Sequence, residues 1–375
     1  MELLQLEHFG QTLRLDGSQA GWQQLYWGGN IVSQLSATEN RETKSIHSFE
    51  LNQQIEPPEG ASLEVDVSPA HIIKCRLAID LTWQPFKINY QLFVDDNIVA
   101  EGQRNSKDIE QQVPRQSAKV EKKFSMLGLL SLGFKFLKSA KIIKVVLAGA
   151  SLAAYSWFFS FQFALSLIAC LVFHEYGHIR AMKHFSMKTK GIYLIPFVGG
   201  LAVTDQKINT RWQDVVISIM GPTFGLLLSI ACLLGYWFTG SQFLAGLAVF
   251  NALLNLFNLL PILPLDGGHI LKSISFSMNS KAGLISCIAG AMLGIFVSYS
   301  LGLALLGFLL LIGTLEIVLE WRTRHQSHLL PLDKYGQLFS TVWYLLTVAG
   351  LIAIIFYFAH SGDQLLALPL KILGS

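Results

Sequence analysis

The spacing of hydrophobic and polar residues divides the chain into two parts. From about residue 5 to residue 112, hydrophobic positions alternate with polar ones in short runs, and Gly or Asp residues separate the runs. This alternation is typical of antiparallel β-strands with one buried face, and Asp95 and Asp96 followed by Asn97 form a hairpin signal. The clearest strand-like runs are residues 24–27, 48–51, 63–67, 75–81 and 89–94. We therefore predict a small all-β soluble domain, sandwich-like, over residues 1–114.

The second part contains apolar runs of about 20 residues, which is the length a helix needs to cross a membrane. We predict about seven transmembrane helices, at residues 142–159, 161–184, 214–238, 243–262, 282–299, 301–320 and 339–359. Composition agrees, since 52% of the 375 residues are hydrophobic and only 14% are charged, against about 25% charged in soluble domains. Residues 142–375 are therefore interpreted as a polytopic α-helical membrane domain.

A basic segment joins the two parts. Residues 115–144 contain eight Lys and Arg against one acidic residue, whereas residues 1–114 contain eight against sixteen. Apolar residues between positions 124 and 140 are interleaved with lysines, which favours a helix lying in the membrane interface over a spanning one. We predict a linker and interfacial helix at residues 115–141, with anionic lipid as its partner. Because this basic run adjoins apolar segments, its charge gives no support for nucleic-acid binding.

The positions of Lys and Arg also predict the orientation. If the seven helices alternate, the basic residues from Arg115 to Lys334 fall on one side, and the turns near residues 160, 240 and 300 on the other side carry no charge. By the positive-inside rule, the N-terminal domain is cytoplasmic and the last helix ends on the opposite side. The N-terminus lacks the features of a signal peptide. We expect a multi-pass protein of the bacterial inner membrane.

One predicted membrane helix contains a metal-binding pattern. His174 and His178 are four residues apart and so share one face of a helix, with Glu175 beside them. Zinc accepts imidazole ligands in a tetrahedral site, and a neighbouring glutamate can take a proton from water as general base. Ionisable residues at hydrocarbon depth are costly, which favours a functional site over structural packing. The four dispersed cysteines indicate neither a thiolate metal site nor a disulfide framework.

A catalytic zinc site needs a third protein ligand. Asp266 follows the predicted helix 243–262, at its cytoplasmic end, with prolines at positions 261 and 264 and glycines at 267 and 268 around it. Proline breaks a helix and glycine permits close backbone approach, so a carboxylate at this point could meet the two histidines. Glu316 is the rival third ligand, since glutamate has that role in other H-E-x-x-H enzymes.

The two motifs together resemble the site-2 protease family of intramembrane zinc metalloproteases. The first motif of that family matches His174, Glu175 and His178. Its second motif matches Asn258, Pro261, Asp266, Gly267 and Gly268. Residues 194–200 resemble the membrane-entering loop of the family, and residues 220–222 resemble a Gly-Pro step in its next helix. The N-terminal part resembles the β-domains of the Fas apoptotic inhibitory molecule family.

The resemblance to site-2 proteases implies roles for individual residues. It implies one zinc ion held by His174, His178 and Asp266. It implies that Glu175 activates water and that Asn258 helps to hold the substrate or the developing oxyanion.

Three further polar positions allow more than one interpretation. Asn251 and Asn255 precede Asn258 on the same predicted helix, and they either join helices by hydrogen bonds or line the path to the zinc. His269 follows the two glycines and is a candidate for indirect contact with the site.

The leading hypothesis is an intramembrane zinc endopeptidase that hydrolyses peptide bonds within or near transmembrane segments of membrane protein substrates. The alternative is a catalytically silent adaptor that binds transmembrane segments, and the complete set of predicted ligands argues against it. A transporter is a third possibility, but the sequence shows no inverted repeat of the kind such folds contain.

Overall fold

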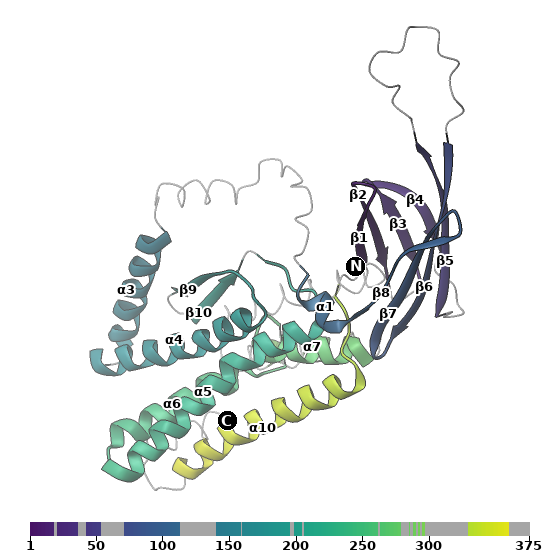
Figure 1. Ribbon diagram of the computed structural model, residues 1–375. Coiled ribbons are helices and arrows are strands. Elements are labelled where there is room, and N and C mark those ends of the chain that lie inside the picture. Colours follow the sequence, from purple (N-terminus) through teal and green to yellow (C-terminus); the bar gives the residue numbers. More distant parts are fainter. Residues whose placement is uncertain are drawn as a thin grey trace. The chain divides into compact units, whose positions relative to one another are not determined.

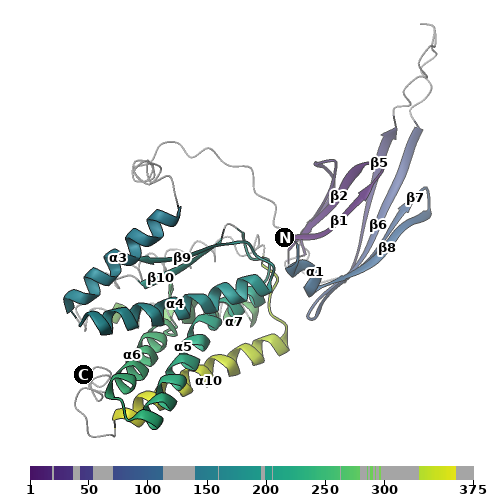
Figure 2. The same ribbon diagram turned by 60° about the vertical axis from the view of Figure 1, so that its left-hand side comes forward.

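The computed structural model describes residues 1–18, 21–36, 43–53, 71–112, 140–158, 160–195, 199–204, 206–261, 263–278 and 329–359, with scattered positions between 285 and 296. These residues fall into two compact units, one made of Met1–Gln112 and Arg322–Lys334 and the other of Val113–Trp321 and Tyr335–Ser375. The first unit consists mainly of strands, and the second consists of helices and one hairpin. Figures 1 and 2 show the elements of each unit from two directions.

Eight strands form two four-stranded antiparallel sheets in the first unit. The sheets have the orders β1-β2-β3-β4 and β5-β6-β7-β8, so within each sheet the strands pair in the order in which they follow one another along the chain. The strands are β1 (Glu2–His8), β2 (Gln11–Gly17), β3 (Gln23–Trp27), β4 (Asn30–Leu35), β5 (Lys44–Gln53), β6 (His71–Trp83), β7 (Phe86–Val94) and β8 (Asn97–Asn105), and a short helix α1 (Ser106–Glu110) follows them. The predicted all-β N-terminal domain is confirmed.

The core of this unit follows from the alternation of residues along each strand. In β6, Leu77 and Ile79 are buried whereas Lys74 and Arg76 are exposed, because successive side chains of a strand point to opposite faces. The buried residues of the two sheets form one cluster. Leu330, from the segment that precedes the last described helix, is 2% exposed and belongs to the same cluster. A residue more than 200 positions away therefore completes the core.

The predicted hairpin at Asp95 and Asp96 is present between β7 and β8. Both residues have positive φ angles, 46° and 61°, as a two-residue type I′ turn requires. The side chain of Asp95 also accepts a hydrogen bond from the backbone N–H of Lys74 at 3.0 Å. The predicted strand at residues 63–67 lies outside the described residues, as does nearly all of the predicted linker and interfacial helix at 115–141.

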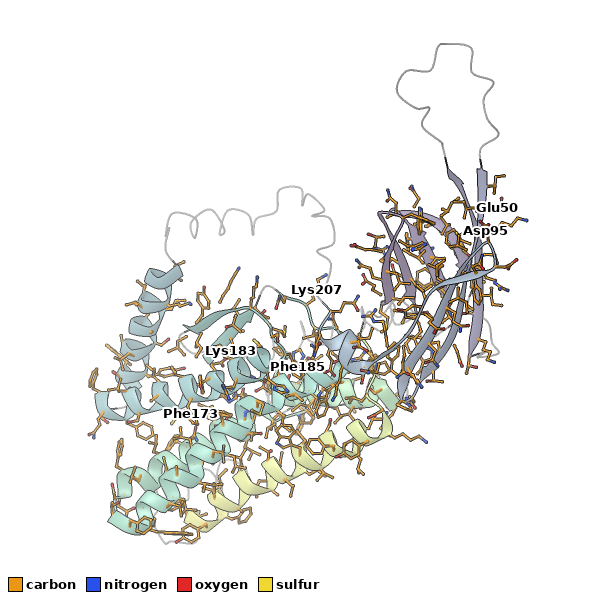
Figure 3. All side chains as sticks on the ribbon, viewed as in Figure 1. Glu50, Asp95, Phe173, Lys183, Phe185 and Lys207 are labelled. Atoms are coloured by element: carbon orange, nitrogen blue, oxygen red, sulfur yellow. The ribbon has the colours of Figure 1, made fainter. Side chains whose placement is uncertain are left out.

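The second unit is built around one central helix. Its described helices are α3 (Ala140–Phe158), α4 (Phe161–His184), α5 (Arg211–Thr239), α6 (Gln242–Asn258), α7 (Asp266–Met278) and α10 (Lys334–Ala359), and a hairpin of β9 (Thr189–Ile195) and β10 (Gly199–Thr204) lies between α4 and α5 in the chain. α5 packs against α4, α6 and α7. Phe173 of α4, labelled in Figure 3, lies against Phe224 of α5 with ring centroids 5.4 Å apart.

Close helix contacts in this unit depend on small residues. A Cβ added at Gly177 of α4 would lie 2.3 Å from the carbonyl oxygen of Met220 on α5. This distance is far inside van der Waals contact, so only glycine lets the two backbones approach so closely. The same use of small residues is common where membrane helices pack together.

Two of the described helices, α5 and α10, are long and apolar enough to cross a membrane. Shorter apolar helices are found at Ile143–Trp157 and Gln242–Asn258. α4 has 24 residues but also carries the polar residues of the H-E-x-x-H motif. The predicted helices at 282–299 and 301–320, together with Glu316, lie almost entirely outside the described residues.

The structure corrects the end of one predicted helix. The helix expected at residues 243–262 ends at Asn258 as α6, four positions early. The physical reason is Pro261, which cannot donate a backbone hydrogen bond and disfavours helical geometry in the residue before it. A new helix, α7, then begins at Asp266.

Candidate metal centre

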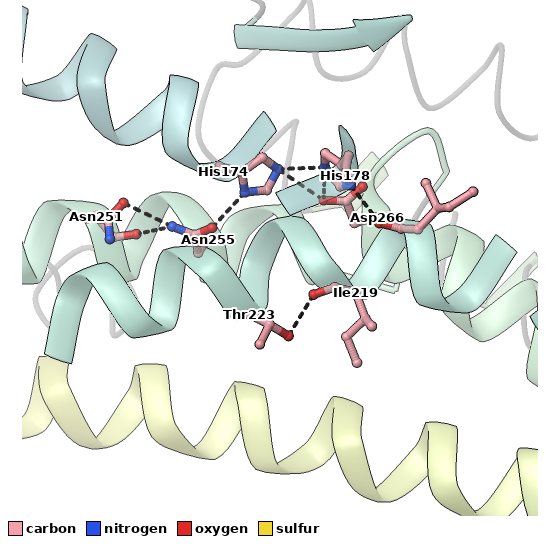
Figure 4. A network of polar contacts seen from close by, with 8 residues as sticks. His174, His178, Ile219, Thr223, Asn251, Asn255 and Asp266 are labelled. Atoms are coloured by element: carbon pink, nitrogen blue, oxygen red, sulfur yellow. Dashed lines mark hydrogen bonds and ion pairs between the residues drawn. The ribbon is translucent and has the colours of Figure 1, made fainter. Parts of the chain in front are cut away.

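Helix α4 places the two histidines of the motif one turn apart on a buried face. His174 is 3% exposed and His178 is 7% exposed. Their Nε2 atoms lie only 3.0 Å apart (Figure 4). The four-residue spacing therefore brings two imidazole nitrogens to a single point, as the helical period predicts.

Asp266 reaches the same point from the first residue of α7. Its Oδ2 atom lies 3.3 Å from Nε2 of His174 and 3.5 Å from Nε2 of His178. The approach depends on Gly267, because a Cβ there would lie 2.1 Å from the carbonyl oxygen of Leu259 at the end of α6. These three side chains, which the sequence predicts as metal ligands, form the group of possible metal ligands found among the described residues.

The hydrogen bonds of the histidines show that this group fits a cation. Nδ1 of His174 lies 2.7 Å from Oδ1 of Asn255, and Nδ1 of His178 lies 2.7 Å from the carbonyl oxygen of Ile217. Both partners are acceptors, so each Nδ1 carries the ring hydrogen and each Nε2 presents a lone pair. Two lone pairs and a carboxylate oxygen therefore face one another across 3.0–3.5 Å. Without a proton or a cation between them these atoms repel one another, and a divalent cation with nitrogen and oxygen ligands would stabilise the cluster.

Glycine also makes room for the site on the side of α5. A Cβ added at Gly221 would lie 2.4 Å from Nε2 of His178 and 2.8 Å from Nε2 of His174. Any larger residue would occupy the space on which the two imidazoles converge. This contact gives a physical reason for the Gly-Pro step that the sequence shows at residues 220–222.

Glu175 lies next to the metal group and faces the hairpin. It is 5% exposed, and a Cβ added at Gly200 of β10 would lie 2.3 Å from its Cγ atom. The backbone N–H of Ala202 on the same strand donates a hydrogen bond to the Glu175 carboxylate. β10 thus covers the candidate general base. The hairpin contains the described residues of the predicted membrane-entering loop, whereas residues 196–198 lie outside them.

The remaining polar positions divide between two networks. Asn255 contacts His174, and its Nδ2 atom donates to the carbonyl oxygen of Asn251 at 2.7 Å. His269 does not contact the metal group in this way, since its Nδ1 lies 3.5 Å from Asp214 on α5. Asn258 is half-buried at the end of α6, and the described hydrogen bonds of the two histidines go to Asn255 and Ile217 instead.

Sequence reasoning missed Asp214 as a residue near the site. It lies in the first turn of α5 and is buried, and Ser273 of α7 donates a hydrogen bond to it. The available signal was an acidic residue at the start of a predicted membrane helix, where it is costly without a partner. The partner itself had no recognisable pattern, since Ser273 is an ordinary small residue of a helix that the sequence did not predict.

Comparison with known proteins finds a family match within the helical unit. Residues 162–241 and 239–297 match the model of peptidase family M50. A putative zinc metalloprotease of Synechocystis sp. is 31% identical over 203 residues, which is 52% of this chain and 47% of the relative. A zinc metalloprotease of Methanocaldococcus jannaschii is 31% identical over 178 residues, which is 46% of this chain and 48% of the relative.

A third relative is stage IV sporulation protein FB of Bacillus subtilis. It is 30% identical over 176 residues, which is 44% of this chain and 60% of the relative. The chain spans about half the length of the curated relatives it matches.

The match to peptidase family M50, the site-2 protease family, thus covers residues 162–297. The predicted resemblance to site-2 proteases is therefore confirmed for this segment. Two of the relatives are named zinc metalloproteases, which agrees with the group of His174, His178 and Asp266 as possible metal ligands. The family also supports the prediction of a membrane protein, which here carries an N-terminal β-domain.

Proposed function

We propose that this chain is an intramembrane zinc endopeptidase that hydrolyses peptide bonds within or near transmembrane segments of membrane protein substrates. The observation that carries the proposal is the convergence of His174, His178 and Asp266 within 4.8 Å in the apolar helical unit. Glu175 follows His174 directly and lies beside this group. A catalytically silent adaptor would have no need of three lone-pair donors held against one another at this depth.

In the proposed mechanism, His174, His178 and Asp266 hold the zinc ion. When bound, zinc acts as a Lewis acid that lowers the pKa of water and polarises a carbonyl group. Glu175 accepts a proton from the attacking water as general base, and the water oxygen bonds to the carbonyl carbon of the scissile peptide. The C–N bond then breaks, and Glu175 returns the proton to the departing amine. We assign Asn258 to holding the substrate or the developing oxyanion, on the resemblance alone.

The substrate must be locally unwound to react. In a transmembrane helix the backbone carbonyls are hydrogen-bonded within the helix and surrounded by side chains, so an attacking water cannot reach them. The proposed substrates are therefore transmembrane segments of other membrane proteins that unwind near the scissile bond.

The proposed topology has about seven spans and a cytoplasmic N-terminal domain. Basic residues gather at one end of the described helical elements, including Lys183 after the metal motif and Lys207 before α5 (Figure 3). Aromatic side chains gather at the opposite helix ends: Trp157 near the end of α3 is 87% exposed and Trp237 near the end of α5 is 56% exposed. Indole rings at helix ends are typical of a membrane interface, and basic residues are typical of the cytoplasmic side.

The proposed domain organisation assigns residues 1–114 to a cytoplasmic β-domain and residues 142–375 to the protease domain. It assigns residues 115–141 to a linker and an interfacial helix, with anionic lipid headgroups as the proposed partner of the lysines. The location that follows is a multi-pass protein of the bacterial inner membrane.

The decisive experiment uses Glu175→Gln in the full chain. This substitution keeps the size of the side chain and removes its basicity, so cleavage should fall by about 10²–10⁴-fold. Zinc should remain bound in stoichiometric amount, because Glu175 is assigned as base and not as ligand. Purified wild-type and variant protein would be compared by metal analysis and by trapping of uncleaved membrane substrates. Loss of zinc in the variant, or unchanged cleavage, would refute the assignment.

A further inference from the structure

A chain of buried hydrogen bonds runs across three helices to His174. Ser229 on α5 accepts from Nδ2 of Asn251 on α6 at 2.8 Å. The carbonyl oxygen of Asn251 accepts from Nδ2 of Asn255 at 2.7 Å, and Oδ1 of Asn255 lies 2.7 Å from Nδ1 of His174 (Figure 4). Ser229, Asn251 and Asn255 are each 0% exposed. Three side chains therefore form a continuous polar path through apolar packing.

This chain fixes which end of the Asn255 amide faces the histidine. Nδ2 of Asn255 is engaged by two oxygens of Asn251, the backbone carbonyl at 2.7 Å and Oδ1 at 3.1 Å. Asn251 is itself anchored, because its Nδ2 donates to the carbonyl oxygen of Gly225 at 2.7 Å. With the NH₂ group of Asn255 directed at acceptors, only its carbonyl oxygen is left for His174.

The orientation of Asn255 in turn determines the tautomer of His174. A carbonyl oxygen at 2.7 Å from Nδ1 requires the ring hydrogen to be on that nitrogen. The lone pair of the imidazole is then on Nε2, which lies 3.3 Å from Oδ2 of Asp266 and faces the candidate metal position. Without an acceptor at Nδ1, the hydrogen could move to Nε2 and block that position.

Packing against α5 also restricts the Asn255 amide. A Cβ added at Gly225 on α5 would lie 2.1 Å from the amide atoms of Asn255. The amide is thus held directly against the backbone of a neighbouring helix, and glycine at position 225 is what makes the space. Gly225 therefore leaves space for the Asn255 amide, just as Gly221 leaves space for the two imidazoles.

We propose that Asn255 is a positioning residue for the metal site, which sets the tautomer and ring orientation of His174 by accepting the hydrogen of its Nδ1 atom. This inference rests on the proposed function, because it concerns the ligand role of His174. Groups that orient metal-binding histidines in this way typically contribute about 10–100-fold to metal affinity. A role limited to joining α5 and α6 would instead leave metal affinity unchanged.

The test measures zinc affinity in the full chain, purified in detergent, by competition with a chromophoric chelator. Asn255→Leu keeps the branching and the number of side-chain heavy atoms but has no acceptor, so it should weaken zinc binding by about 10–100-fold. Asn255→Asp keeps an oxygen acceptor for Nδ1 and should bind zinc more tightly than the leucine variant. Ser229→Ala is the matched control, because it removes the hydrogen bond between Ser229 and Asn251 without changing His174 or Asn255. The zinc affinity of this variant should stay within about threefold of wild type.

A second readout is independent of activity. The visible spectrum of the Co²⁺-substituted protein reports ligand geometry, and it should change in Asn255→Leu but not in Ser229→Ala. If Asn255→Leu does not fold, Gly225→Ala displaces the Asn255 amide without removing any polar group, and it should weaken zinc binding in the same direction. If a folded Asn255→Leu or Gly225→Ala protein binds zinc as tightly as wild type, the proposal is overturned.

The proposed function is tested separately in the same titration. His174→Ala should lose zinc binding altogether if His174 is a ligand. Zinc retained by His174→Ala would refute the ligand assignment, whereas zinc lost in His174→Ala and retained in Asn255→Leu would refute only the positioning role.

Discussion

The hydroxyl of Ser273 on α7 donates to Oδ2 of Asp214 on α5 at 2.6 Å. His269 of α7 approaches the other oxygen of the same carboxylate at 3.5 Å. α7 begins with Asp266, one of the three candidate ligands, and α5 packs against His174 and His178, the other two. The Asp214 carboxylate therefore connects the two helices that surround the metal group. The tie is buried, and a buried hydrogen bond to a charged group stabilises more than an exposed one.

Removing this tie should destabilise the helical unit. We expect Ser273→Ala to lower the free energy of unfolding by about 1.5–3 kcal/mol, because a buried carboxylate oxygen loses its donor. Ser277→Ala is the control on the same helix, since its hydroxyl donates to the backbone carbonyl of Ser273 within α7. Thermal unfolding of both variants in detergent would compare them, and equal loss of stability would contradict a specific role for the tie between helices.

Gly221→Ala should abolish zinc binding without removing any polar group. The added Cβ would lie 2.4 Å from Nε2 of His178, so the imidazole must turn away from the metal position. Gly246→Ala on α6 is the matched control, because a Cβ there meets no atom within 4 Å. Zinc content per chain, measured by elemental analysis, should be close to one for the control and close to zero for Gly221→Ala. A metal-loaded Gly221→Ala protein would show that the imidazoles do not converge at this position.

The identity of the third ligand is tested by two carboxylate substitutions. Asp266→Asn should weaken both zinc binding and cleavage, because a neutral amide is a poor zinc ligand. Glu316→Gln should spare both. An empty site in Glu316→Gln together with a loaded site in Asp266→Asn would transfer the ligand role to Glu316.

The β-domain should lose stability as the pH falls from about 6.5 to about 4. His47 is fully buried, and burial lowers its pKa from 6.5 to about 4 because the charged imidazolium is poorly solvated there. Between these values the unfolded chain binds a proton that the folded domain does not, so stability rises with pH across this range and falls on acidification. The loss should reach at most about 3 kcal/mol.

The pH effect can be measured by hydrogen exchange of residues 1–112 in the full chain. His47 contacts Ser33 at 2.9 Å and Gln23 at 3.0 Å, and glutamine at position 47 could offer a donor and an acceptor without titrating. We therefore expect His47→Gln to flatten the dependence between pH 4 and 6.5. An equally steep dependence in that variant would assign the effect to other groups.

The proposed orientation predicts opposite labelling of two introduced cysteines. A cysteine in place of Ser106, in the helix that follows the last strand of the β-domain, should be inaccessible to impermeant thiol reagents in intact cells. A cysteine in place of Ser361, after α10, should be labelled. The reverse pattern would invert the protein in the membrane and place its metal site near the other leaflet.

The sequence predicted those features that depend on local periodicity. The alternation in residues 75–81 and 89–94 and the Asp95–Asp96 turn correctly indicated β6, β7 and the hairpin to β8, because side-chain direction in a strand depends only on neighbouring positions. In the same way, the spacing of His174 and His178 fixed a shared helical face. Pro261 and Gly267 correctly indicated a break in the backbone before Asp266.

Features that depend on contacts between distant segments were not predictable from the pattern. The sequence left open whether Asn255 joins helices or serves the zinc path, because that depends on which helix its amide faces. The pairing of Asp214 with Ser273 links residues 59 positions apart and leaves no local signature. The strands at residues 2–8 and 11–17 were also not singled out, because few turn residues mark where each of these short alternating runs begins and ends.

The contribution of Leu330 to the β-domain core sets an order of events during synthesis. The first 112 residues contain all eight strands, yet one position of their hydrophobic cluster is filled from a segment encoded more than 200 residues later. The ribosome must therefore produce the first 330 residues, and with them every described helix before α10, before this core can close. A β-domain released early as a fragment would lack a buried leucine, at a cost of about 2–5 kcal/mol typical of an empty leucine site. The domain that begins the chain is thus among the last parts to be finished.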